Sequence, residues 1–160
     1  MRNTVSNKNE LITLRNGLVV DKEFIAQESG TICHYVSQTV VGIHNNEIVY
    51  VLIFPNQKLL NQPDFVKSPE EGCFCPRSFS ELNMCLSGCT SSLNQKMKPE
   101  YSKIHHGLII KTPLSIKDNT LNEDNELVEN SVLLKYQVEI QKMLHGEPIS
   151  DENIFVMNVL

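Results

Sequence analysis

The segment YVSQTVVGIHNNEIVYVLIF, residues 35–54, decides the predicted fold. Two runs rich in β-branched and aromatic residues flank His44-Asn45-Asn46, and this arrangement predicts a β-hairpin. The run IVYVLIF, residues 48–54, does not alternate apolar with polar side chains. We therefore expect both faces of this strand to be covered, and we expect Pro55 to end it.

Other segments on either side of this hairpin also have strand character. LITLRNGLVV, residues 11–20, carries Asn16-Gly17 between two apolar runs, which favours a second hairpin with a type I′ turn. A short helix from Asp21 to Gln27 competes with the second half of that hairpin. HHGLIIKTPLSIK, residues 105–117, and the final IFVMNVL, residues 154–160, are also predicted as strands.

Residues 134–141 show strict alternation. Leu134, Tyr136, Val138 and Ile140 are separated by polar residues, which is the period of a half-buried strand. A helix through residues 133, 137, 140 and 144 is the alternative, but it places Gln137 on the apolar side. The sequence therefore favours a strand here.

Together these segments predict an all-β or β-dominated single domain over residues 1–160, a small barrel or sandwich built from hairpins. A cysteine-bearing loop and short helix are expected to interrupt it at about 56–103, with the Cys-rich insertion itself at 68–103. The capping pair Ser78 and Glu81 predicts a helix over about 79–87 that ends at Gly88. Residues 1–10 form a polar lead-in, and 118–130 an acidic exposed loop.

Four of the five cysteines lie in GCFCPRSFSELNMCLSGC, residues 72–89. Two close pairs of soft ligands are what a structural zinc site requires, and metal binding can fold a segment that has little to bury. The sequence predicts such a zinc site, with His105 or His106 able to replace one ligand. Neither pair has the common C-x2-C spacing, so free thiols and disulfides stay open as alternatives. The predicted ligands are Cys73, Cys75, Cys85 and Cys89.

A catalytic use of the same cysteines is the other possibility. A cysteine followed in the chain by His105 or His106 is similar in order to papain-like and NlpC/P60-like cysteine hydrolases. Cys85 and Cys89 would lie near the end of a helix, whereas it is the beginning of a helix that lowers a thiol pKa. No catalytic residues are therefore assigned, and a cysteine-dependent hydrolase is kept as the alternative function.

Charge and composition limit the partners. The formal net charge of −5 and the scattered basic residues argue against binding to nucleic-acid backbones. The basic run around Lys96, Lys98 and Lys103 is interpreted as a solvated face. No run approaches the roughly 18 apolar residues that a membrane-spanning helix needs, and residues 1–10 predict no signal peptide. A cytoplasmic or virion location is expected.

These observations favour a non-catalytic structural or binding protein. The apolar strand at 154–160 needs a sheet or a partner to cover its edge, which predicts protein partners or self-assembly. The asparagine-rich composition is compatible with a viral or phage particle. The sequence thus predicts an assembly subunit with a structural zinc site.

Overall fold

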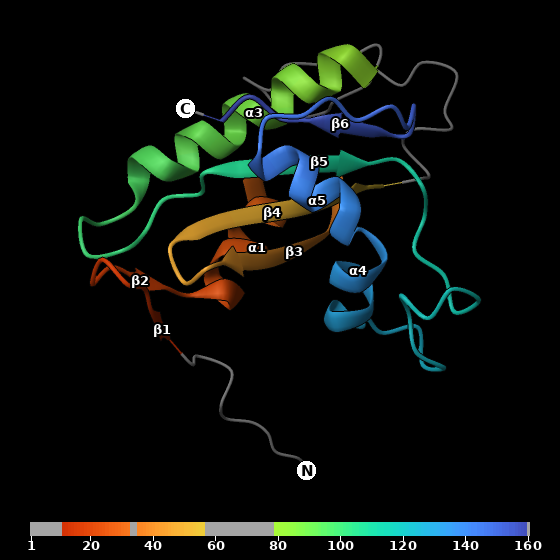
Figure 1. Cartoon of the computed structure of the whole chain (residues 1–160), viewed down its shortest axis with the longest axis horizontal. Helices are drawn as coiled ribbons and strands as arrows, with labels where there is room; N and C mark the ends of the chain where they lie inside the picture. Colours follow the sequence, from red (N-terminus) through yellow and green to blue (C-terminus); the bar gives the residue numbers. More distant parts are fainter. Residues whose placement is uncertain (1–10, 33–34, 57–78, 160) are drawn as a thin grey trace.

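The computed structural model describes residues 11–32, 35–56 and 79–159. In these ranges the chain is mixed α/β, with helices on both sides of a central sheet (Figure 1). In chain order the elements are β1 (Ile12–Thr13), β2 (Val19–Val20), α1 (Lys22–Ile32), β3 (Val36–His44), β4 (Ile48–Pro55), α3 (Phe79–Lys96), β5 (His106–Ile110), α4 (Glu129–Lys135), α5 (Gln137–Leu144) and β6 (Ile154–Val156).

Within the described residues the main sheet has four strands in the order β3-β4-β5-β6. β3 and β4 form the predicted antiparallel hairpin, in which Asn45 and Asn46 adopt the positive φ values of 53° and 57° that tight turns require. β5 pairs with β4 in parallel, and β6 pairs with β5 in the antiparallel sense. The hairpin prediction for residues 35–54 is confirmed.

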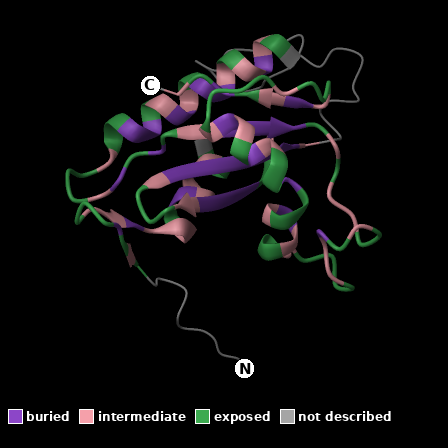
Figure 2. Ribbon diagram, viewed as in Figure 1, coloured by how far each residue is buried: buried purple, intermediate pink, exposed green. Residues whose placement is uncertain are grey.

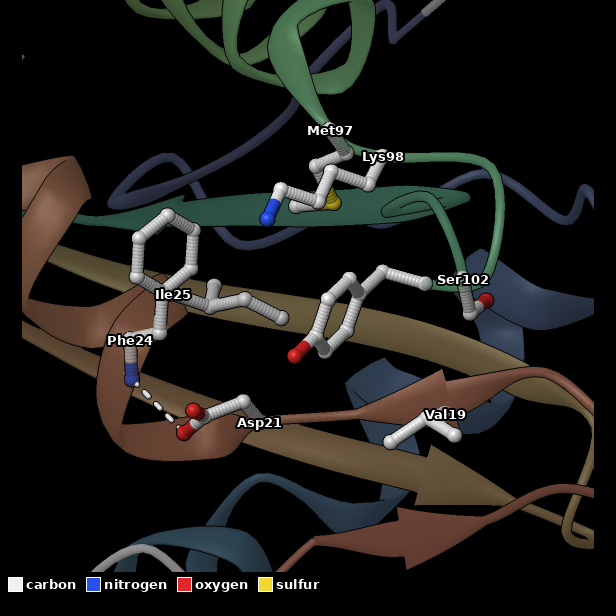
Figure 3. A pocket seen from close by; sticks show the side chains of 8 residues that line it. Val19, Asp21, Phe24, Ile25, Met97, Lys98 and Ser102 are labelled. Atoms are coloured by element: carbon white, nitrogen blue, oxygen red, sulfur yellow. Dashed lines mark hydrogen bonds between the residues drawn. The ribbon is translucent and has the colours of Figure 1, made fainter.

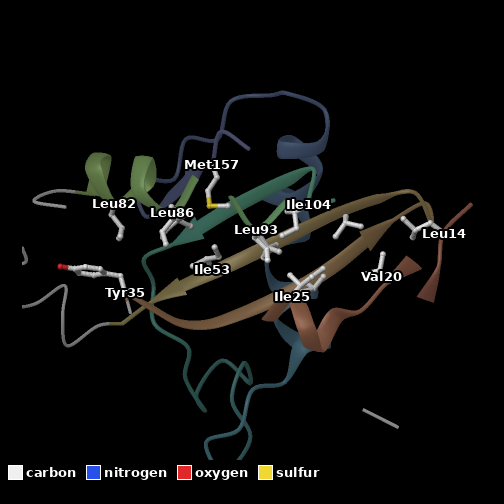
Figure 4. Packing of buried hydrophobic residues seen from close by; sticks show 14 residues of the cluster. Leu14, Val20, Ile25, Tyr35, Ile53, Leu82, Leu86, Leu93, Ile104 and Met157 are labelled. Atoms are coloured by element: carbon white, nitrogen blue, oxygen red, sulfur yellow. The ribbon is translucent and has the colours of Figure 1, made fainter. Parts of the chain in front are cut away.

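The side chains of β4 show why this strand has no polar residues. Val49, Val51 and Ile53 pack into one apolar cluster, which contains residues of α1 and α3. The intervening residues of β4 pack into a second cluster, which contains residues of α4 and α5. Both faces of the strand are buried, as its sequence predicted (Figure 2), and Figure 4 shows the cluster on the face that α1 and α3 cover.

The first hairpin is also present, but with a different turn. Ile12 pairs with Val20 and Thr13 with Val19, so the loop is longer than two residues. Gly17 has a φ of 90°, whereas Asn16 is not among the described residues with positive φ. The type I′ prediction is wrong, since that turn needs positive φ at both positions. The helix that competed with this hairpin exists as well, because α1 begins directly after it.

The all-β prediction is wrong, and α3 is the first reason. This helix has 18 residues and lies in the segment predicted to be a loop with a short helix. Gly88, the predicted end, lies inside it, and a Cβ atom at Gly88 would meet nothing within 4 Å. A glycine inside an exposed helix turn costs only about 1 kcal/mol, which the packing of Leu82, Leu86 and Leu93 against the sheet offsets.

Helices α4 and α5 are the second reason. Val132, Tyr136, Ile140 and Met143 are buried, and their spacing of three or four residues is that of one helical face. Leu134 and Val138 completed the apparent alternation, but they are 67% and 57% exposed. The predicted strand over 134–141 is thus two short helices.

In the part of the chain that the structure describes, no helix combines the length and the apolar character that crossing a membrane requires.

Candidate functional site

Two adjoining hollows lie between the start of α1 and the segment that joins α3 to β5. Figure 3 shows the side chains that line the inner one. The inner pocket has a volume of about 190 Å³ and mostly apolar walls. Phe24 and Ile25 approach it from α1, and Met97 and Lys98 from the end of α3. The residues that line the inner pocket are Val19, Asp21, Phe24, Ile25, Met97, Lys98, Tyr101 and Ser102.

The outer groove is wider and more open, with a volume of about 740 Å³. It shares Met97, Lys98, Tyr101 and Ser102 with the inner pocket, so the two hollows adjoin each other. Its lining as described contains Lys98, Lys103, His105 and His106 but no acidic side chain. The outer groove therefore offers hydrogen-bond donors and positive charge, and the inner pocket offers apolar contact.

Backbone hydrogen bonds fix the connecting segment against β2. The Val19 N–H donates to the Glu100 carbonyl at 3.0 Å, and the Ser102 N–H donates to the Val19 carbonyl at 2.9 Å. These bonds form a parallel bridge between Val19 and Tyr101. The walls of the inner pocket are therefore held in place without a ligand, which lowers the cost of binding one.

A buried asparagine fixes the other end of the segment. Asn94 of α3 is 2% exposed, and its side-chain amide both donates to the Ile104 carbonyl at 2.9 Å and accepts from the Ile104 N–H at 2.7 Å. The two bonds satisfy the backbone of Ile104 just before β5 begins. The polar side chains of residues 103–106 are thereby positioned along the outer groove.

His105 is held in one tautomer at the rim of the outer groove. Its backbone N–H donates to the Val49 carbonyl at 2.8 Å, and its Nδ1 accepts from the Val49 N–H at 3.0 Å. Partial desolvation of the ring and the neighbouring His106 lower the pKa of His105. An Nδ1 that accepts a hydrogen bond carries no proton, so Nε2–H is the donor that remains available.

A separate polar cluster ties α4 to the loop before it. Desolvation tends to raise the pKa of Asp118, but hydrogen bonds from Lys135 and Thr120 outweigh it and hold that pKa well below its usual range. Lys135 forms an ion pair with Asp118 and lies 5.4 Å from the centre of the Tyr136 ring. These hydrogen bonds and the ion pair join α4 to residues 115–120, so we regard the cluster as a structural tie.

The predicted zinc ligands are only partly described. Cys73 and Cys75 lie outside the described residues. Cys85 and Cys89 lie on α3, where they are half-buried and pack against the apolar cluster below the helix. Among the described residues no group of three or more histidine, cysteine or acidic side chains is arranged to hold a metal. The four-cysteine site stays a prediction.

Apart from His105 and His106, for which the sequence suggests a role as zinc ligands or as partners of a catalytic cysteine, the residues that line the two hollows were not predicted from the sequence. The pattern around Lys98 and Lys103 indicates a solvated face, and no pattern points to Tyr101. Both lysines are indeed exposed, but they border the outer groove. The hollow exists because β2, α1 and the segment after α3 meet in space, and no local pattern carries that information.

Comparisons with known proteins place the fold. No protein-family model matches the chain, and no curated protein matches it. The A-PCP didomain of carboxylic acid reductase from Segniliparus rugosus, solved with AMP, aligns over 89% of this chain and 18% of its own, with 14% identity and a TM-score of 0.60. The A domain from the same organism, with AMP and a co-purified carboxylic acid, aligns over 88% and 20%, with 14% identity and a TM-score of 0.61.

The adenylation domain of the carboxylate reductase from Mycobacterium chelonae is similar as well, with 14% identity, a TM-score of 0.58, and coverage of 88% of this chain and 20% of its own. The chain thus has the fold of part of an adenylation domain and spans about a fifth of the length of these proteins.

This likeness corrects the predicted function. A non-catalytic, β-rich assembly subunit is contradicted, because the similar structures are mixed α/β domains of enzymes. The similar structures also give no support to the predicted structural role, virion location or zinc dependence. The alternative, a cysteine hydrolase, is not supported either, and neither Cys85 nor Cys89 lines the groove that His105 and His106 line.

Proposed function

We propose that the chain is one lobe of a carboxylate-adenylating enzyme and that it binds an adenine nucleotide in the inner pocket and the outer groove. The observation that carries the proposal is the fold likeness to adenylation domains solved with AMP, which extends over 88–89% of the chain. Because fold alone does not define function, the chemistry of the two hollows must support the same activity.

Adenylation joins a carboxylate oxygen to the α-phosphorus of ATP and releases pyrophosphate. The phosphate oxygens carry negative charge throughout, so a site for this reaction needs cationic and N–H donors nearby. The outer groove supplies Lys98, Lys103 and the imidazoles of His105 and His106. Its described lining has no carboxylate to repel a phosphate.

The size of the chain limits what it does alone. It corresponds to about a fifth of the similar structures, so we propose that a second, larger lobe supplies the remaining contacts to ATP and to the carboxylic acid. We expect the isolated chain to bind AMP weakly, with a Kd on the order of 1 mM or somewhat below, and to show no ATP–pyrophosphate exchange. We propose that this second lobe is the protein partner that the sequence predicts.

Amide NMR spectra of the 160-residue chain during AMP titration test the proposal. We expect shifts confined to residues 19–25 and 97–106. The double variant Lys98→Gln/Lys103→Gln should weaken binding several-fold, whereas Lys117→Gln, which changes a lysine outside both hollows, should not. An AMP titration that moves no resonance in these two segments would refute the proposal.

A further inference from the structure

We propose that the inner pocket takes the adenine base and that Asp21 selects it through the exocyclic amino group. This inference rests on the proposed function, because it concerns how the same nucleotide lies in the site. It adds a base-specific subsite to the phosphate contacts of the outer groove.

The dimensions and the walls of the inner pocket suit a flat ring system. Its volume of about 190 Å³ is below the roughly 300–1,000 Å³ of pockets that enclose a whole drug-sized ligand. A single ring system fits, and the remainder of the ligand must extend into the outer groove. Phe24, Met97 and Tyr101 offer aromatic and thioether surfaces. Planar bases stack on such surfaces whatever polar groups they carry along their edges.

Asp21 is the acidic residue in the described lining of the inner pocket. Its Oδ1 accepts a hydrogen bond from the Phe24 N–H at 3.0 Å, which fixes the carboxylate directly before α1 (Figure 3). A carboxylate has about four acceptor positions, so one such bond leaves capacity for a ligand donor. The amino group of adenine is a donor, whereas the corresponding carbonyl of hypoxanthine is an acceptor and would face the carboxylate unfavourably.

The order of charges along the two hollows agrees with this orientation. Asp21 lies on the β2–α1 side of the inner pocket, and Lys103 and His106 line only the outer groove. In AMP the exocyclic amino group lies at the base end of the molecule and the negative charge at the phosphate end. Lys98 lines both hollows, so the orientation with the base inside places the amino group near the Asp21 carboxylate and the phosphate near both Lys98 and Lys103.

The test compares AMP with IMP by calorimetric titration of the 160-residue chain. IMP has a carbonyl in place of the 6-amino group and a proton on the neighbouring N1, so it presents an acceptor at the position where AMP presents a donor. We expect AMP to bind at least about tenfold more tightly, because a site with a fixed acceptor discriminates strongly against a ligand that lacks the donor. Asp21→Asn should reduce the ratio to about threefold or less. Asparagine is as good as aspartate before a helix, so the variant should fold. Asp124→Asn, in the exposed loop, is the matched control and should keep the full ratio.

The outcomes separate the two proposals. Equal binding of AMP and IMP by the unaltered chain, or a ratio that Asp21→Asn leaves unchanged, would overturn the inference and leave nucleotide binding in place. The AMP/IMP ratio of the unaltered chain decides the matter even if the variant does not fold. If neither nucleotide binds, the inference and the proposed function both fail.

Discussion

The two faces of the central sheet are each covered by a pair of helices, but the two coverings differ. On one face lie α1 and α3, with 11 and 18 residues, and the segments that join them to the strands border the inner pocket and the outer groove. On the other face lie α4 and α5, with seven and eight residues, and Lys135 of α4 pairs with Asp118 of the preceding loop. The first face carries the candidate site, and the second mainly stabilises the sheet.

This difference shows how one sheet serves two purposes. The short helices of the second face bury an apolar stripe against the sheet. On the first face, the chain returns from α3 to β5 through a segment that hydrogen bonds hold against Val19 and Asn94. A hollow remains where that segment passes α1, as connections at the end of a sheet often produce.

The largest expected effect tests the second face. Ile140→Ala should lower the free energy of unfolding by about 2–5 kcal/mol, because Ile140 is 4% exposed and packs against the sheet. Leu134→Ala should change it by less than about 0.5 kcal/mol, because Leu134 is 67% exposed. Urea denaturation followed by circular dichroism measures both. Equal losses would mean that the two side chains share a buried face, as in the strand that the sequence favoured.

The same pair of residues shows how far sequence reasoning could go. The β3–β4 hairpin was predictable because its two runs are long, β-branched and separated by two asparagines that tolerate positive φ. Residues 134–141 misled because exposed Leu134 and Val138 have the same apolar character as buried Tyr136 and Ile140. Which side chains are buried decides between the two-residue repeat of a strand and the three- to four-residue repeat of a helix. Burial depends on the whole fold and cannot be read from these residues alone.

The candidate site was less predictable than the fold. Asp21, Lys98 and Tyr101 come from two distant segments, and a single sequence contains nothing that brings them together. The cysteines attracted attention because they are close in sequence, whereas the lining residues are close only in space. Asn94, which positions the segment before β5, looks like any helical asparagine until its two bonds to Ile104 are seen.

A smaller change in the free energy of unfolding is expected when the ion pair between α4 and its preceding loop is removed. Asp118→Asn should lower the free energy of unfolding at pH 7 by about 0.5–1 kcal/mol, a modest figure because the ion pair is partly exposed. Folding lowers the pKa of Asp118, so its contribution is present above the ordinary value of 3.8 and is lost as the pH falls below it. The difference between the variant and the unaltered chain should therefore begin to shrink below about pH 5 and go on shrinking below about pH 3. Asp124→Asn is the control, and a difference independent of pH would contradict the assignment.

The smallest expected effect brings the comparison back to the first face. Folding lowers the pKa of His105, so the unfolded chain binds a proton more readily, and stability should fall slightly as the pH drops through the ordinary value of 6.5. Protonation at Nδ1 would also break the bond from the Val49 N–H. Imidazole NMR signals between about pH 5 and 8 measure the pKa of His105 directly, and a value at or above 6.5 would contradict the prediction.

A phosphate bound in the outer groove would favour the charged imidazole ring of His105, so AMP should raise the pKa of His105. The signal of His145, at the end of α5 on the other face, should stay where it is, and equal movement of both signals would place the phosphate elsewhere.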